Sequence, residues 1–166
     1  MSDRRGFFSA LSSLMLGTAK EQSPFYPHLP GYRQEGRSAC SECVSSSCVR
    51  VCPESIVIRE AGAVPVLDFS RRGCTFCAEC AHACEHDLFA SAPAVRIDAE
   101  VRIAIAECLA WNQTICRSCA DVCNDRAIEF TGLFNPQINA ERCSACGFCI
   151  GVCPGYAISV RPKESV

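Results

Sequence analysis

The chain has 166 residues, a length that suits one or two small domains, and a formal net charge of −2. No basic stripe accompanies an aromatic surface, and no apolar run approaches the roughly 20 residues of a membrane span, so the composition argues against nucleic-acid binding and against a transmembrane segment. Sixteen residues are cysteine, which indicates metal in an intracellular chain and a disulfide framework in a secreted one.

Residues 1–36 contain no cysteine and form an N-terminal arm that ends in a proline-rich connector at 24–31, which we expect to be extended. Near its start, D-R-R-G-F-F resembles a twin-arginine export signal, although the apolar stretch that follows is short and Gly17–Ala19 is a weak cleavage site. The alternative is a retained amphipathic helix that docks on a partner or a membrane surface, because the apolar residues fall at helical spacing. The residues alone leave both interpretations open. The candidate docking residues are Arg4, Arg5, Phe7, Phe8, Leu11, Leu14 and Met15.

The cysteines fall into four sets of four, and no cysteine lies outside a set. The second and fourth sets read C-x2-C-x2-C-x3-C, and a proline follows the fourth, which is the run that holds cubane iron–sulfur clusters in bacterial ferredoxins. The first set is stretched between Cys43 and Cys48, and the third between Cys108 and Cys116. The sets are Cys40/Cys43/Cys48/Cys52, Cys74/Cys77/Cys80/Cys84, Cys108/Cys116/Cys119/Cys123 and Cys143/Cys146/Cys149/Cys153.

A short β-prone segment follows each set, so the repeated unit is a cysteine loop, a helical turn and a strand. The segments 56–58 and 64–67 predict a hairpin around Gly62, and further strands are expected at 88–89, 95–97, 127–130, 137–139 and 157–160. The gap between the third and fourth cysteines of a set equals one helical turn, which Pro53 and Pro154 end in two of the sets. We therefore predict an α+β fold of two tandem ferredoxin-like modules, at 37–97 and 98–166, with short helices and short antiparallel strands.

Tight quartets suit an inorganic core better than disulfides, which space their cysteines irregularly. Structural zinc sites with four cysteines usually split into two C-x2-C pairs with a longer loop between them, whereas here the third and fourth cysteines follow at once. The sequence therefore predicts up to four [4Fe-4S] clusters. Four oxidised clusters would bring the net charge to about −10, which favours partners with basic docking patches.

In two-cluster ferredoxins, three cysteines of a set hold one cluster and the fourth holds the cluster of the partner set. Pairing the first set with the second, and the third with the fourth, gives the expected ligand groups, although the spacing leaves a different pairing between modules open. The groups are Cys40/Cys43/Cys48/Cys84, Cys74/Cys77/Cys80/Cys52, Cys108/Cys116/Cys119/Cys153 and Cys143/Cys146/Cys149/Cys123.

The two stretched sets have alternative interpretations. One is a loop bulge around an ordinary four-iron cluster, and the other is a labile, three-iron or transiently filled site. Phe76 and Phe148 lie beside ligands, and we expect them to keep water off the clusters. His82 and His86 flank Cys84, but no cysteine is missing for them to replace, so we expect exposed bystanders. No triad, carboxylate pair or glycine-rich phosphate loop accompanies the cysteines, and we predict a protein that is not an enzyme.

Three stretches resemble the ferredoxin-type NapF family, the accessory proteins of the periplasmic nitrate reductase system. They begin at Cys74 (C-T-F-C-A-E-C-A-H-A-C-E-H-D-L-F), Glu107 (E-C-L-A-W-N-Q-T-I-C-R-S-C-A-D-V-C) and Phe134 (F-N-P-Q-I-N-A-E-R-C-S-A-C-G-F-C-I-G-V-C-P), and the R-R-G near the start also matches. The stretched third set with its C-L-A-W segment is the most specific of these features. The longer gap between Cys43 and Cys48 departs from the family pattern.

The resemblance implies a cytoplasmic protein whose clusters serve the catalytic subunit of the nitrate reductase before export, in the maturation of its iron–sulfur or molybdenum cofactor, by electron transfer or cofactor handling. It also implies that the arm is a retained docking segment rather than a signal for periplasmic export by the twin-arginine route. Two rivals remain. One is a general electron-transfer subunit between a quinol-oxidising module and a terminal reductase, in contact with other electron carriers. The other is a docking chaperone with structural clusters.

Overall fold

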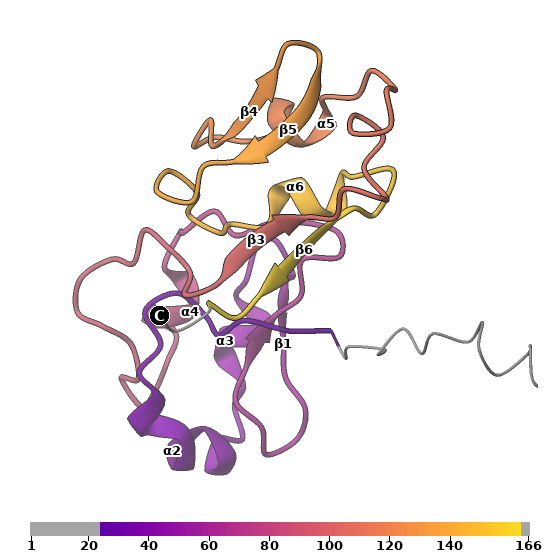
Figure 1. The fold of residues 1–166 in the computed structure, drawn as a ribbon. Helices are drawn as coiled ribbons and strands as arrows, with labels where there is room; N and C mark the ends of the chain where they lie inside the picture. Colours follow the sequence, from indigo (N-terminus) through magenta and orange to yellow (C-terminus); the bar gives the residue numbers. More distant parts are fainter. Residues whose placement is uncertain (1–23, 164–166) are drawn as a thin grey trace, which may run out of the picture.

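The computed structural model describes residues 24–163 as a mixture of very short helices, short antiparallel strands and long loops (Figure 1). The candidate docking residues of the arm, from Arg4 to Met15, lie outside the described residues. No helix in the described part of the chain is long and apolar enough to cross a membrane.

Four single-turn helices follow one design, because each begins just before the third cysteine of a set and ends before the fourth. They are α3 (Ser47–Arg50), α4 (Glu79–His82), α5 (Ser118–Asp121) and α6 (Phe148–Gly151). In α4 and α6, the residue before the turn has a positive φ, at Ala78 (61°) and Gly147 (84°), so the chain reverses sharply into the helix. The helical turn predicted between the third and fourth cysteines is thereby confirmed in all four sets.

The strands form three separate two-stranded antiparallel sheets. β1 (Val57–Ile58) pairs with β2 (Val66–Leu67) in the hairpin predicted around Gly62, which has a φ of +72°. β4 (Ile128–Thr131) and β5 (Phe134–Ile138) form a second hairpin, which turns at Gly132. β3 (Glu100–Ile103) pairs with β6 (Ile158–Arg161), and this sheet joins the beginning and the end of the second half of the chain.

Three elements differ from the prediction. The strand expected at 88–89 is only an isolated bridge at Phe89. The strand expected at 95–97 is wrong, because Ile97 is buried and gives its N–H to the carbonyl of Ser144 instead of to a strand, and the strand begins later, at Glu100. A helix at 34–42, made of η1 (Gln34–Gly36) and α2 (Arg37–Glu42), was not predicted and carries Cys40. Val95 and Ile97 alternate with Arg96 as in a strand, but this segment finds no strand partner, whereas 34–42 lacks the hydrophobic periodicity on which sequence-based assignment depends.

The proline-rich connector packs against the first cysteine-rich half. The N–H of Leu67 in β2 donates to the carbonyl of Pro27 at 2.8 Å, and Tyr32 forms an isolated antiparallel bridge with Phe89. Leu29, in the connector, is 3% exposed. The described part of the arm therefore supplies apolar contacts to the first half of the molecule.

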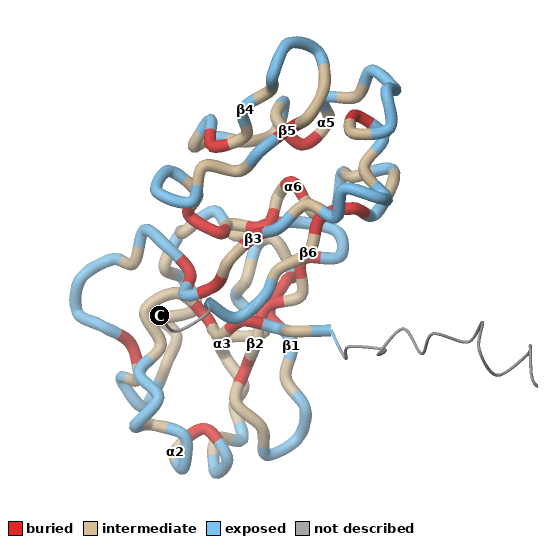
Figure 2. The backbone as a smooth tube through the Cα atoms, viewed as in Figure 1, coloured by how far each residue is buried: buried red, intermediate tan, exposed pale blue. Residues whose placement is uncertain are grey.

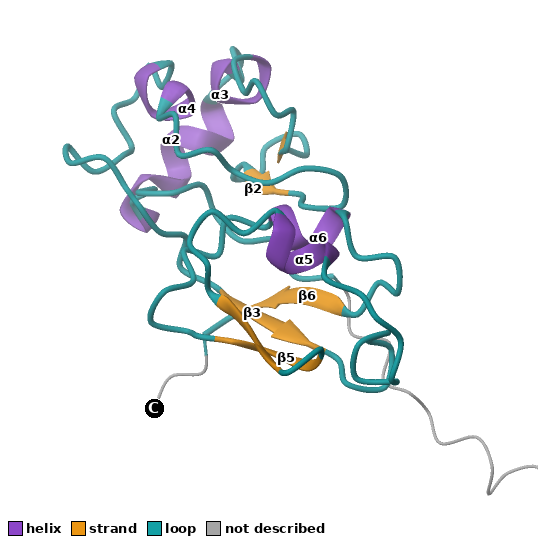
Figure 3. Ribbon diagram, turned by 90° about the horizontal axis from the view of Figure 1, so that it is seen from above, coloured by secondary structure: helices purple, strands orange, loops and turns teal. Residues whose placement is uncertain are grey.

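Figure 3 places α2, α3 and α4 at one end of the molecule and β3, β5 and β6 at the other, with α5 and α6 between them. The buried positions shown in Figure 2 are small in number, and cysteines belong to this core. The stability of this core is therefore coupled to any metal that the cysteines bind.

Candidate metal centres

The sixteen cysteines of the sequence line four cavities, four to each cavity. Every cavity takes three cysteines from one set and one from its neighbour, which is the grouping expected from the two-cluster pattern. We number the sites by the set that gives three cysteines. The first site is lined by Cys40, Cys43, Cys48 and Cys84, the second by Cys74, Cys77, Cys80 and Cys52, the third by Cys108, Cys116, Cys119 and Cys153, and the fourth by Cys143, Cys146, Cys149 and Cys123.

The single-turn helices produce this exchange of ligands. α3 and α4 are in contact, and so are α5 and α6. Each helix carries the third cysteine of its set, which lines one site, and the fourth cysteine, just beyond the helix, lines the neighbouring site. The first and second sites are therefore linked through α3 and α4, and the third and fourth through α5 and α6.

The second site joins cysteines of unequal exposure. Cys77 is exposed, whereas the other fifteen cysteines are buried or half-buried. Cys52 is half-buried, follows the end of α3 and completes the second site from the first set. Phe76 beside Cys77 is half-buried and lines the same cavity, and its expected shielding of a cluster stays a prediction. Both cysteines nevertheless line the cavity to which the two-cluster pattern assigns them.

The cavities have similar sizes, with volumes of about 400, 370, 350 and 330 Å³ for the first, second, third and fourth sites. These volumes include the open mouths of the cavities. Within 24–163, no three side chains of histidine, cysteine, aspartate or glutamate gather at the spacing that one metal ion requires. Four thiols around such a space fit a four-iron cubane, in which each iron takes one thiolate.

Several of these thiols are buried, and burial disfavours their negatively charged thiolate form when no metal is bound. Burial raises the pKa of Cys74 to about 11, that of Cys80 to about 12 and that of Cys119 to about 11. Burial likewise raises the pKa values of Cys143 and Cys149. Because metal ligation requires thiolates, the positive iron core would supply the charge that these sites lack.

Backbone and apolar groups close much of the sites from the outside. Phe76 lines the second site and Phe148 the fourth. Ala145 and Gly147 are buried beside the ligands of the fourth set, where their small size permits close approach of the backbone. The sulfur atoms of the fourth cysteines in the third and fourth sets each accept a hydrogen bond at 3.3 Å from the backbone N–H four residues later.

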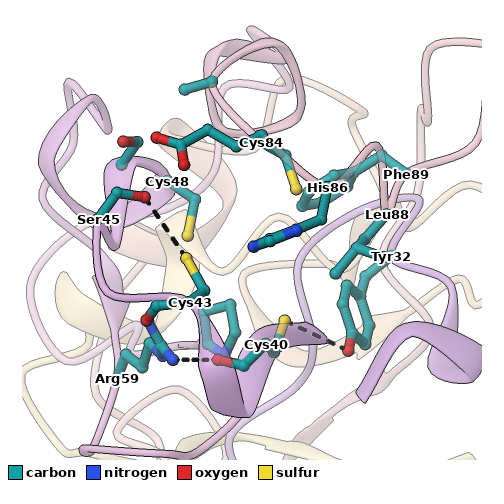
Figure 4. A pocket seen from close by; sticks show the side chains of 14 residues that line it. Tyr32, Cys40, Cys43, Ser45, Cys48, Arg59, Cys84, His86, Leu88 and Phe89 are labelled. Carbon is teal, nitrogen blue, oxygen red and sulfur yellow. Dashed lines mark hydrogen bonds between the residues drawn. The ribbon is translucent and has the colours of Figure 1, made fainter. Parts of the chain in front are cut away.

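The stretched loop of the first site is held by Arg59, at the end of β1 (Figure 4). Its guanidinium donates to the carbonyl of Cys43 at 2.9 Å and to the hydroxyl of Ser46 at 2.6 Å, and it also donates to the carbonyl of Cys40. A further bond runs from Nε to the carbonyl of Ala63 at 2.8 Å. One cation therefore ties the long Cys43–Cys48 loop to the β1–β2 hairpin.

Polar side chains also reach the sulfur atoms of the first site. The hydroxyl of Tyr32 donates to Sγ of Cys40 at 3.6 Å, and burial together with this bond raises the pKa of Tyr32 to about 12. The hydroxyl of Ser45 lies 3.4 Å from Sγ of Cys43 and is the main reason that the pKa of this thiol falls to about 7. His86 also lowers the pKa of this thiol, and Figure 4 shows its ring pointing in among the cysteines.

The stretched loop of the third site is held by neutral groups. The indole N–H of Trp111 donates to the carbonyl of Pro136 in β5 at 3.1 Å. The amide of Asn112 donates to the carbonyls of Ile105, Ala106 and Cys108, the last at 2.9 Å. The loop is therefore folded on itself and fastened to the second hairpin.

The fourth ligand loop is fixed by Asp125. Its Oδ2 accepts from the backbone N–H of Ser144 at 2.9 Å and from the Ser144 hydroxyl at 2.5 Å. Ser144 is 8% exposed, so both donors lie away from water and are satisfied by this carboxylate.

The sequence therefore indicated the cysteines but not the residues around them. His82 and His86 are exposed as expected, yet His86 also lines the first site. Tyr32, Arg59 and Asp125 had no signal in the spacing of the cysteines, because each comes from a segment outside the cysteine set whose ligand loop or sulfur it contacts.

The family model described as a 4Fe-4S binding domain (Fer4) matches residues 136–159, which include the fourth set. The ferredoxin-type protein NapF of Escherichia coli K12 is 36% identical over 126 residues, which cover 74% of this chain and 75% of the relative. The ferredoxin-type protein NapF of Haemophilus influenzae is 29% identical over 164 residues, or 95% of this chain and 90% of the relative. One component of an ion-translocating oxidoreductase complex from Methanosarcina acetivorans is 41% identical over 46 residues, 28% of this chain and 17% of that protein.

Proposed function

The chain belongs to the ferredoxin-type NapF family and binds [4Fe-4S] clusters, and we propose that it carries four of them in two tandem ferredoxin-like modules and transfers electrons without being an enzyme. The observation that carries this proposal is the division of sixteen cysteines among four cavities of similar size. In each cavity, four thiols from two neighbouring sets surround the space that one cubane fills.

The two modules would be built alike. In the second half, β3 and β6 form an outer pair, and the β4–β5 hairpin lies between these two strands along the chain as an inner hairpin. In the first half, the isolated bridge between Tyr32 and Phe89 corresponds to the outer β3–β6 pair. The β1–β2 hairpin corresponds to the inner β4–β5 hairpin. The same order of outer pair and inner hairpin supports two tandem units.

We further propose that the protein acts in the cytoplasm on the catalytic subunit of the periplasmic nitrate reductase, before that subunit is exported, by delivering electrons or handling its cofactor. The family name supports an association with nitrate reductase. In this proposal the N-terminal arm stays on the protein and docks through the apolar residues between Phe7 and Met15, whose spacing is that of an amphipathic helix.

A pull-down with the nitrate reductase catalytic subunit tests the proposal. The cluster-loaded chain should retain the subunit, while a chain with Cys143→Ser and Cys146→Ser should retain less of it if the loaded fourth site shapes the contact. Loss of binding on removal of residues 1–16, with all iron still bound, would assign docking to the arm. Failure of the loaded, intact chain to retain the subunit would contradict the proposed partner.

The alternative is a general electron-transfer subunit, and the match to part of an ion-translocating oxidoreductase complex favours it. This alternative predicts reversible reduction of the clusters and rapid exchange of electrons with unrelated carriers, with no preference for the nitrate reductase subunit. A reduction assay with several carriers, compared with the binding assay above, separates the two functions.

A further inference from the structure

The two halves of the molecule meet where the segment before the second cysteine set lies against the ligand loop of the fourth. The backbone N–H of Cys74 donates to the carbonyl of Cys146 at 2.7 Å. Cys74 lines the second site, and Cys146 lines the fourth. A single hydrogen bond thus connects a candidate ligand of one half with a candidate ligand of the other.

Glycines make this approach possible. At three positions along the contact, a Cβ atom would lie within 2.7 Å of an atom of the opposite half, which is closer than real Cβ atoms come. The contacts are Gly73 with Phe148, Gly147 with Phe69 and Gly151 with Arg71. The Ile97 N–H, which donates to the Ser144 carbonyl at 2.9 Å, adds a second backbone bond between residues on either side of this contact.

The interior of the contact is dry. Phe69 is 3% exposed, Ile97 and Ala145 are each 1% exposed, and Gly73 and Gly147 are buried. The second and fourth sites are therefore electrostatic neighbours across a packed joint with little water to screen them.

Within each half the order of sites is set by the paired helices. α3 and α4 are in contact, and each carries a ligand of one site and is followed by a ligand of the other, so they connect the first and second sites; α5 and α6 connect the third and fourth in the same way. The contact between Cys74 and Cys146 then connects the pair formed by the first and second sites with the pair formed by the third and fourth.

We propose that the four sites form one line in the order first, second, fourth, third, with the Cys74–Cys146 contact as the electronic link between the halves. This inference rests on the proposed function, because it concerns the path that electrons take between the sites. The order in space differs from the order in sequence, since the third set comes before the fourth along the chain. The first and third sites, which are the two with stretched loops, become the two ends.

The chemistry of this link is a one-electron transfer. When an electron crosses the joint, the site that gives it is oxidised by one electron and the site that takes it is reduced by one, and no bond is formed or broken. The electron comes from a one-electron carrier protein at one end and leaves to another at the other end. The Cys74 N–H and the Cys146 carbonyl provide the bonded path across the joint.

Magnetic interaction between reduced clusters tests the order, because adjacent paramagnetic centres broaden each other's electron paramagnetic resonance (EPR) signals. Two variants are compared after reduction with dithionite, each keeping two of the four sites. One keeps the second and fourth, and the other keeps the second and third. Sites are removed by paired cysteine-to-alanine changes that spare Cys74 and Cys146: Cys40 with Cys43 for the first, Cys108 with Cys116 for the third and Cys143 with Cys149 for the fourth.

The variant with the second and fourth sites should show interacting signals, and the variant with the second and third should show two independent ones. Equal or stronger interaction in the second variant overturns the proposed order. Iron and sulfide are counted first: about eight irons per chain are expected from two four-iron clusters. Loading of fewer clusters by the intact chain would contradict the proposed function, whereas full loading with the wrong interaction pattern would contradict only the order.

A full-length variant decides the matter if the cysteine variants do not load. Gly73→Ala should displace Phe148, weaken the interaction signal of the reduced protein and speed hydrogen exchange at the Cys74 and Ile97 amides, while keeping all iron. Gly132→Ala is the matched control, because its Cβ meets no atom within 4 Å although its φ of +66° is strained. A Gly73→Ala protein with unchanged signal and unchanged exchange would overturn the link.

Discussion

The stretched loops of the first and third sites solve the same problem with different chemistry. In the first, Arg59 donates to the carbonyls of Cys40 and Cys43 and brings a positive charge to the ligand loop. In the third, Trp111 and Asn112 hold the loop with neutral donors. The arginine that neighbours the third set, Arg117, instead lies over the ring of Phe130 at 4.3 Å.

The spacing of the cysteines therefore does not determine which side chains hold a ligand loop. Both loops are longer than the ferredoxin pattern, and in both the extra length is fastened to a hairpin, β1–β2 for the first and β4–β5 for the third. In the first loop, the fastening group also carries a positive charge and would therefore act on a cluster bound there. In the third, it supplies geometry alone.

Removal of the metal should have the largest effect, and it tests whether the two halves differ in their dependence on metal for folding. Anaerobic treatment with a strong iron chelator should unfold both halves, because cysteine side chains are part of the small core and their thiolates lose the positive charge that holds them together. Near-ultraviolet circular dichroism and hydrogen exchange measure the loss. Persistence of native exchange protection in β3 and β6 would show that the second half folds on its own apolar contacts.

Replacement of Arg59 has the next largest effect and is confined to the first site. Arg59→Leu removes hydrogen bonds from a charged donor to two ligand carbonyls, which costs about 2–3 kcal/mol of loop stability. The expected result is loss of about four of about sixteen irons on exposure to a mild chelator. Iron counting on anaerobically prepared protein measures it.

Arg117→Leu is the control for this prediction, because it removes an arginine beside a cysteine of the third set that stacks on Phe130. It should retain all iron. Arg59→Lys should fall between the two, since lysine keeps the charge but lacks the planar fork that reaches several carbonyls. Equal iron loss in the Arg59→Leu and Arg117→Leu proteins would mean that the hydrogen bonds of Arg59 do not stabilise iron binding at the first site.

Trp111 gives the corresponding prediction for the third site. Trp111→Phe keeps an aromatic ring but loses the donor to Pro136, which costs about 1 kcal/mol, and the third site should release iron a few times faster than in the unaltered protein. Stopped-flow bleaching with a chelator follows the rate. An effect as large as that of Arg59→Leu would remove the contrast between a charged and a neutral fastening.

The cysteine pattern was enough to predict the helical turn in each set, because three residues between the third and fourth ligands equal one helical turn. β-branched residues marked the strands that follow the first, third and fourth sets. The cysteine pattern was also enough to suggest which cysteines share a site. It could not predict β3, because Glu100–Ile103 becomes a strand only by pairing with β6, about sixty residues later. Nor could it indicate Arg59 or Tyr32, since their contacts with the ligand loop arise from tertiary packing rather than from local sequence.

Tyr32 provides the smallest expected effect and the finest test of how the first site differs from the third. Its hydroxyl donates to Sγ of Cys40 at 3.6 Å, which is the long distance typical of a bond to sulfur. A donor to a ligand sulfur stabilises the more negative, reduced state of a cluster, so Tyr32→Phe should lower the reduction potential of the first site. A bond worth about 0.5–1 kcal/mol corresponds to roughly 20–40 mV for one electron. Because the ring and its packing against Phe89 remain, the iron content should not change. An EPR-monitored redox titration resolves the shift, and a potential that stays the same would mean that this hydroxyl orders the connector rather than tuning the site.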